Sequence, residues 1–168
     1  MKYIFSIVLF LCQLSFAKAN DSLTVYVFLS ETCPICQNQT FYLRELQQEF
    51  AGKKIGLIGV FPNENFSTNE SIEKFAKKFR LNFPLIKDES QVLTKQLGAT
   101  ITPQAIVYQQ DTKEIKYNGM INNGFERVGR RRQVITDFYL RDALTELIEG
   151  KTVTLSETKP VGCFIIKK

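Results

Sequence analysis

The hydrophobic pattern in the first half of the chain predicts strands that alternate with helices. Residues 23–29 are almost wholly apolar and rich in β-branched and aromatic side chains, which indicates a buried strand. Pro34 suits the first turn of a helix, and apolar residues then recur at helical spacing, so we expect a helix over 34–50, ended by Gly52. Residues 54–61 predict a second buried strand.

The second half continues the alternation and ends with a hairpin and a helix. We expect a helix that begins with a capping box at Ser67 and Glu70, followed by a strand at 83–86 and a helix at 89–97. A hairpin of two strands comes next, at 105–108 and 115–117. A polar stretch at 118–132, a helix at 140–148 and a short strand near Cys163 complete the chain. A strand–helix–strand opening predicts parallel strands, and the hairpin adds antiparallel ones. This pattern predicts one α/β domain over 20–168, with a mixed central sheet and helices on both faces.

The first residues have the order of a secretory signal. Lys2 supplies a positive start, residues 4–14 are mostly apolar, and Ala17 and Ala19 are the small residues that a signal peptidase requires. We therefore predict a signal peptide over 1–19 and an exported, periplasmic or otherwise extracytoplasmic protein. An uncleaved N-terminal membrane anchor is the alternative, although the apolar run is short for a span.

Composition narrows the chemistry that is available to the chain. Its 168 residues include 22 basic and 17 acidic ones, and a net charge of +5 is too small to favour nucleic-acid binding. Histidine is absent, which excludes Ser-His-Asp and Cys-His catalysis as well as metal sites that contain histidine. Any catalysis must therefore use thiols, carboxylates, amines or hydroxyls.

The cysteine pair Cys33 and Cys36 carries the strongest chemical signal. It lies where a predicted strand meets a predicted helix, and the positive end of a helix favours a thiolate at Cys33. Cys36 follows about one helical turn later, within reach of Cys33 but more buried. We therefore predict that Cys33 is the nucleophile and Cys36 the resolving thiol, with a purely structural disulfide as the alternative.

These residues resemble a known superfamily. Residues 28–36 are similar to the strand–CxxC–helix active site of the thioredoxin superfamily, and Thr102-Pro103 resembles the cis-Pro loop that faces it. Residues 83–88 and 98–103 resemble the redoxin branch, which includes the alkyl hydroperoxide reductase/thiol-specific antioxidant proteins. The resemblance implies a thioredoxin-like fold, thiol–disulfide oxidoreductase activity, and substrate contacts from Thr102 and Pro103.

Two other functions fit parts of the same pattern. A thiol peroxidase of this fold is one, but Tyr26 stands where the peroxidases have a proline before the reactive cysteine. A copper(I)-binding or partner-binding module without turnover is the other, using Cys33, Cys36 and Cys163. Cys163 itself is either a third redox thiol or a small apolar residue of the C-terminal strand.

The remaining expectations concern proton transfer and partners. Glu31 and Asp88 are candidates to carry the proton of Cys36, provided that either lies within hydrogen-bond reach. We expect no cofactor, no metal and a monomer. The substrates are disulfide-containing proteins or small thiols, and a membrane-borne thiol donor or acceptor resets the pair. Reduction and formation of a substrate disulfide both fit these residues.

Overall fold

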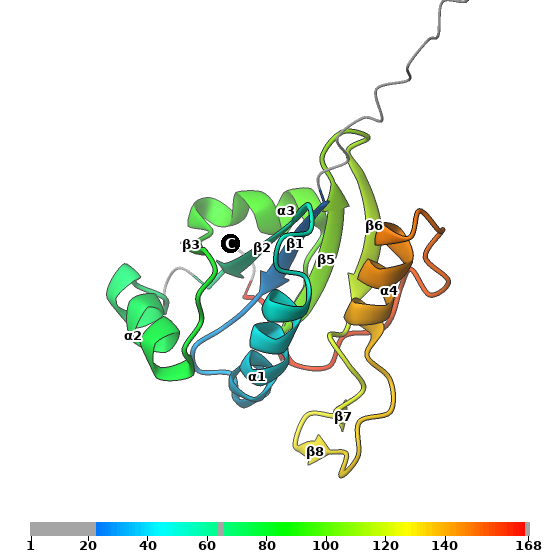
Figure 1. The fold of residues 1–168 in the computed structure, drawn as a ribbon. Helices are drawn as coiled ribbons and strands as arrows, with labels where there is room; N and C mark the ends of the chain where they lie inside the picture. The colour runs from blue at the N-terminus through cyan, green and yellow to red at the C-terminus, as the bar shows by residue number, and fades with distance from the viewer. Residues whose placement is uncertain (1–22, 64–65, 167–168) are drawn as a thin grey trace, which may run out of the picture.

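The computed structural model describes residues 23–63 and 66–166 (Figure 1). The predicted signal peptide over 1–19 lies outside these residues. Within the part of the chain described, no helix has the length and apolar character needed to cross a membrane.

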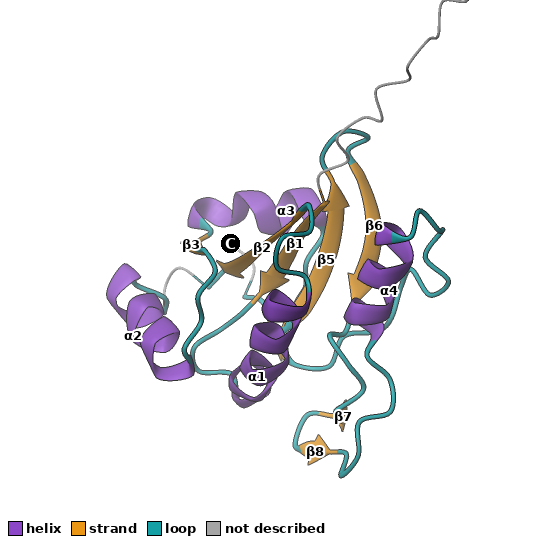
Figure 2. Ribbon diagram, viewed as in Figure 1, coloured by secondary structure: helices purple, strands orange, loops and turns teal. Residues whose placement is uncertain are grey.

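A five-stranded mixed sheet forms the centre of the molecule, as predicted (Figure 2). Its strands are β1 (Leu23–Phe28), β2 (Ile55–Phe61), β3 (Leu85–Lys87), β5 (Gln104–Gln109) and β6 (Glu114–Gly119), in the order β3-β2-β1-β5-β6. β1, β2 and β3 are parallel, because each is joined to the next through a helix. β5 runs antiparallel to both β1 and β6, and the β5–β6 pair is the predicted hairpin.

The helices cover both faces of this sheet. They are α1 (Pro34–Glu49), α2 (Asn69–Phe79), α3 (Val92–Leu97), which follows a 3-10 turn at Glu89–Gln91, and α4 (Tyr139–Ile148). The larger core cluster joins α1, α2 and α4 to one face, and the smaller cluster joins α3 to the other. β1 shows why two cores form: Val25 and Val27 face the first, whereas Tyr26 and Phe28 face the second.

The N-terminus of α2 corrects the predicted capping box. Thr68, not Ser67, is the N-cap: its side chain accepts a hydrogen bond from the backbone of Ser71, whose hydroxyl is in turn bonded to the backbone of Thr68. The Ser67 hydroxyl instead donates to the Glu31 carboxylate. The cap therefore lies one position later than predicted, and Ser67 bonds instead to the loop that follows β1.

The third strand also begins later than the prediction of 83–86. β3 starts at Leu85, which pairs with Gly59 of β2. Pro84 has no N–H to donate, so only its carbonyl bonds to the sheet, accepting from the Gly59 N–H at 2.9 Å. Phe83 is buried in the core although it precedes the strand.

Two small sheets lie outside the central one. β7 (Phe125–Arg127) and β8 (Arg130–Arg131) form a hairpin within the predicted polar stretch. Arg130 and Arg132 both pair with Glu126 there, so this hairpin is exposed and charged. The second sheet joins β4 (Ile101–Thr102) to the predicted C-terminal strand, β9 (Cys163–Phe164).

Candidate active site

Cys33 occupies the N-cap position of α1, directly after the loop that leaves β1. Pro34 begins the helix there because its fixed backbone angle suits the first turn and its missing N–H leaves no donor unpaired. The Cys33 sulfur therefore lies at the positive end of a 16-residue helix, where a negative charge is stabilised. Only 1% of the Cys33 surface is exposed.

Cys36 lies nearly one turn further along α1 and is fully buried. The backbone N–H of Ser30 donates to its sulfur at 3.4 Å. Burial, followed by hydrogen bonding to Cys33 and the charge of Cys33, raises the pKa of the Cys36 thiol well above its ordinary value. Cys36 is therefore held as a protonated thiol.

The pKa of Cys33 moves in the opposite direction, to about 5. The largest cause is the hydrogen bond from the Cys36 thiol, a second bond from the Cys163 thiol also lowers the pKa, and burial opposes both. At neutral pH Cys33 is therefore the thiolate of the pair, as a nucleophile requires.

The predicted cis-Pro loop faces these cysteines. The Thr102–Pro103 peptide bond is cis, which confirms that prediction. The Thr102 carbonyl oxygen lies 3.3 Å from the Cys33 sulfur and accepts a hydrogen bond when that thiol is protonated. Residues 69 positions apart in the sequence thus meet, and the carbonyl is placed beside the reacting sulfur.

Cys163 joins the same site from the end of the chain. β9 runs antiparallel to β4, with Cys163 opposite Thr102, and the Cys163 sulfur lies 3.0 Å from the Cys33 sulfur. Burial, together with the bond to Cys33 and its charge, raises the pKa of Cys163 to about 11, so it is a thiol that donates to the Cys33 thiolate. Cys163 is a direct neighbour of the predicted nucleophile.

The two carboxylates proposed for proton transfer are committed to other donors. Glu31 accepts hydrogen bonds from the hydroxyls of Ser67 and Ser71, at 2.7 and 2.5 Å. The buried Asp88 carboxylate accepts from the backbone N–H groups of Leu93 and Thr94 and so caps α3. The geometry gives Glu31 and Asp88 structural roles, and it lends their proton-transfer role no support.

Gln104 is a supporting residue that the sequence reading missed. Its side-chain oxygen accepts from the backbone N–H groups of Thr100 and Ile101, and its amide donates to the Asn118 side chain. These bonds hold the segment before Pro103 against the central sheet. A buried polar residue at the start of an apolar strand was the available signal.

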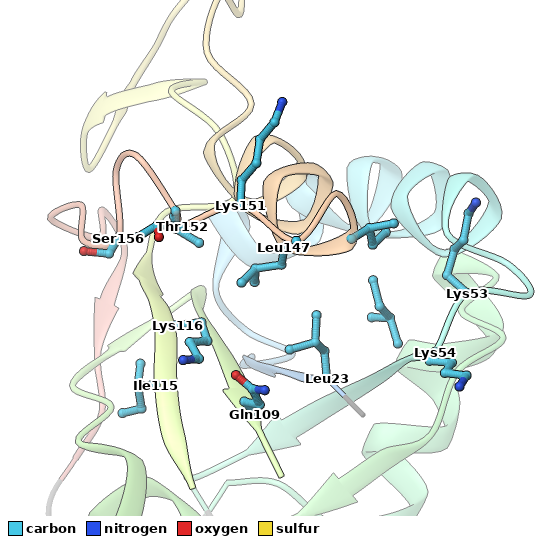
Figure 3. A pocket seen from close by; sticks show the side chains of 14 residues that line it. Leu23, Lys53, Lys54, Gln109, Ile115, Lys116, Leu147, Lys151, Thr152 and Ser156 are labelled. Atoms are coloured by element: carbon cyan, nitrogen blue, oxygen red, sulfur yellow. The ribbon is translucent and has the colours of Figure 1, made fainter. Parts of the chain in front are cut away.

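A pocket of about 680 Å³ lies at the other end of the sheet (Figure 3). Leu23 at the start of β1, Gln109 at the end of β5 and Leu147 of α4 line it, with Lys53 and Lys151 among the basic residues around it. Because Cys33 follows the end of β1, this pocket is separate from the cysteines. Among the described residues, no group of three or more His, Cys, Asp or Glu side chains is arranged to hold a metal ion.

Comparison with known proteins finds curated relatives that are 25–26% identical to part of this chain. It is 26% identical over 106 residues to a chloroplastic peroxiredoxin Q of Sedum lineare, covering 61% of this chain and 55% of the relative. It is 25% identical over 89 residues to the thiol-disulfide oxidoreductase ResA of Bacillus thuringiensis subsp. konkukian, covering 53% and 50%. The chain thus spans about half the length of the curated relatives it matches.

The fold has a match over nearly its whole extent. The crystal structure of a hypothetical protein from Sinorhizobium meliloti 1021 is 26% identical, with a TM-score of 0.77 over 89% of this chain and 82% of that one. The sheet order, the CxxC at the end of β1 and the cis-proline before β5 make the fold thioredoxin-like, as predicted. The AhpC/TSA family model matches residues 11–122, and the chain belongs to that family.

Proposed function

We propose that this protein is a thiol–disulfide oxidoreductase that uses Cys33 and Cys36. The observation that carries the proposal is that the pKa values of two neighbouring thiols shift in opposite directions. The pKa of Cys33 is lowered to about 5, whereas burial raises the pKa of Cys36. In such a pair, the thiolate attacks the substrate disulfide, and the protonated thiol resolves the mixed disulfide afterwards. The relative named thiol-disulfide oxidoreductase supports the same reaction class.

The reaction balances on these two residues. The Cys33 thiolate attacks one sulfur of a substrate disulfide, which forms a mixed disulfide and releases the other sulfur as a thiolate. The Cys36 thiol then loses its proton, attacks the Cys33 sulfur and expels the second substrate sulfur, which takes up a proton. The substrate gains two electrons, and Cys33 and Cys36 become a disulfide; the reverse sequence oxidises a dithiol substrate.

Thr102, Pro103 and Ser30 shape this reaction without exchanging electrons. The Thr102 carbonyl oxygen lies 3.3 Å from the Cys33 sulfur, next to the atom to which a substrate sulfur would bond. The Ser30 N–H points at the Cys36 sulfur and stabilises the negative charge that develops there during resolution. Thr102 and Pro103 are thus proposed as substrate contacts, and Ser30 as a positioning residue.

The proposed compartment is outside the cytoplasm, and it rests on the signal-like pattern over residues 1–19. In such a compartment a membrane-borne thiol donor or acceptor resets the Cys33–Cys36 pair. Processing is tested by expression in a host with a secretory pathway and determination of the N-terminus of the exported protein. Export with Asn20 as the first residue supports the proposal, and retention in the cytoplasm contradicts it.

Reduction of insulin disulfides, driven by dithiothreitol, tests the oxidoreductase activity. We expect the full chain to accelerate the reaction. We expect Cys36→Ser/Cys163→Ser, which lacks both neighbouring thiols, to trap substrate on Cys33 when it is incubated with insulin in the absence of dithiothreitol. If the protein accelerates no disulfide reduction and Cys36→Ser/Cys163→Ser traps no adduct, the proposal fails. Consumption of hydrogen peroxide with the same reductant measures the alternative, since a peroxiredoxin is among the relatives.

A further inference from the structure

Residues 161–166, called here the docked tail, lead back from beyond α4 (Figure 1) and pair with β4, whose Thr102 contacts Cys33. It adds β9 to β4 and buries Ile165 in the core cluster that also contains Phe28 of β1 and Val60 of β2. Four further hydrogen bonds hold it: Ile165 N–H to Thr100 O, Thr102 Oγ1 to Cys163 O, Gln91 Nε2 to Ile166 O, and Ile166 N–H to Asn63 Oδ1. The segment is therefore an ordered part of the site.

The docked tail lies where an extended substrate is expected to pair. Backbone groups at a strand edge bind an incoming peptide by adding it as a further strand. β4 is the edge next to Cys33, and β9 already pairs with it there, with Cys163 opposite Thr102. The Cys163 sulfur, 3.0 Å from the Cys33 sulfur, thus takes the place of a substrate sulfur.

Gly162 makes this close approach feasible. A Cβ atom at position 162 would lie 2.1 Å from the carbonyl oxygen of Thr102 and 2.7 Å from its carbon. These are backbone atoms, which cannot swing aside as a flexible side chain does. Glycine at 162 therefore lets the tail press against β4 and brings Cys163 to the nucleophile.

The docked tail also accounts for the low accessibility of Cys33. Cys33 is 1% exposed, although it stands at the N-cap of α1, outside the helix itself. The Cys163 sulfur lies 3.0 Å from the Cys33 sulfur, and the thiols of Cys163 and Cys36 both donate hydrogen bonds to it. A substrate must displace the tail before it reaches Cys33.

We propose that Cys163 is a third redox cysteine, which resolves mixed disulfides on Cys33 from the substrate side and covers Cys33 between reactions. This inference rests on the proposed function, because it needs Cys33 to attack a substrate disulfide. The tail leaves when substrate enters and then returns as an intramolecular competitor. Tethering gives Cys163 a high effective concentration beside Cys33.

The exchange steps balance without an additional reductant. After Cys33 has formed a mixed disulfide with the substrate, the Cys163 thiol loses its proton, attacks the Cys33 sulfur and forms the Cys33–Cys163 bond. The Cys33–substrate bond breaks, and the departing substrate thiolate takes a proton. Cys36 then attacks the Cys33 sulfur, Cys163 leaves and is reprotonated, and the disulfide ends on Cys33 and Cys36.

Oxidised glutathione is a probe that separates this inference from the proposed function. In Cys36→Ser, we expect Cys33 to be glutathionylated and then resolved, so that peptide mapping finds a Cys33–Cys163 disulfide. In the double variant Cys36→Ser/Cys163→Ser, we expect the glutathione adduct to persist on Cys33. A persistent adduct in Cys36→Ser, with no Cys33–Cys163 link, overturns the inference. A double variant that forms no adduct overturns the proposed function itself.

Gly162→Ala tests the docking without altering any cysteine. It forces β9 away from β4, and we expect the reduced protein to be alkylated at Cys33 by iodoacetamide about tenfold faster, as local opening exposes the sulfur. Gly56→Ala in β2 is the matched control, since its Cβ would meet atoms only at 3.9 Å or more. Thermal unfolding establishes that both variants are folded. An alkylation rate equal to that of the parent protein overturns the covering role of the tail.

Discussion

Two regions bring a cysteine to the same nucleophile, and they are built very differently. Cys36 is fully buried on α1, a 16-residue helix whose Leu43 and Leu46 anchor it in the larger core. Cys163 is half-buried on β9, which has two residues and is anchored mainly through Ile165. The first neighbour of Cys33 is therefore fixed by a long helix, whereas the second is held by a short strand that, in our proposal, detaches when substrate enters. The difference teaches that the length and burial of the supporting element set how firmly each thiol is held beside Cys33.

Removal of the shared nucleophile is expected to have the largest effect. Among the described residues, Cys33→Ser eliminates the one sulfur that contacts both regions. We expect insulin reduction to fall by at least about three orders of magnitude, since loss of a catalytic nucleophile costs up to about 10⁶-fold. The insulin assay with dithiothreitol measures it. Asp111→Asn, in the exposed turn between β5 and β6, is the control. Retention of more than a tenth of the activity in Cys33→Ser would place the chemistry elsewhere.

The two thiol donors are expected to differ in their effect on the pKa of Cys33. A pKa of about 5 means that the thiolate persists down to about pH 5, so loss of a donor raises the pKa and protonates Cys33 at a higher pH. Because the bond from Cys36 is the larger cause, we expect a larger rise in Cys36→Ala than in Cys163→Ala. Thiolate absorbance followed against pH measures both shifts, and the opposite ranking would make Cys163 the dominant neighbour.

Truncation of Ile165, the buried side chain that anchors the docked tail, is expected to have the next largest effect. Ile165 is 6% exposed in the core, and Ile165→Ala should lower the free energy of unfolding by about 3 kcal/mol through lost burial and the cavity that remains. Phe164 is 80% exposed and serves as the neighbouring control, with a change of about 0.5 kcal/mol or less. Urea unfolding measures both. Equal, small changes would indicate that Ile165 does not anchor the tail.

Loss of the Gln104 hydrogen bonds, which hold the segment before Pro103, is expected to have the smallest effect of the four changes. Gln104→Leu leaves the N–H groups of Thr100 and Ile101 without their acceptor, and we expect a loss of about 2 kcal/mol in urea unfolding. Gln109→Leu, at the far end of β5, is the matched control. If both variants lose the same stability, the bonds of Gln104 have no special importance for the loop.

Local patterns predicted most of the architecture and the central pair. The apolar run of β1, the helical spacing of α1 and the CxxC between them depend on neighbours in the chain, and each appears close to its predicted position. The α2 cap was misplaced by one residue because Ser67 bonds to Glu31, which is 36 positions away. The sequence offers Asp88 only as a candidate for proton transfer, and the structure adds that its carboxylate caps α3.

The sequence by itself determined that Cys33 begins a helix, that Cys36 follows it by one turn, and that Pro103 precedes a strand. These are short-range relations, because helix periodicity and turn chemistry act over a few residues. Only the tertiary structure decided the place of Cys163, which lies 130 positions from Cys33 in the chain and 3.0 Å from it in space. The physical reason is that the contact depends on β9 pairing with β4, on the close approach at Gly162 and on the burial of Ile165, and none of these is encoded in a local pattern.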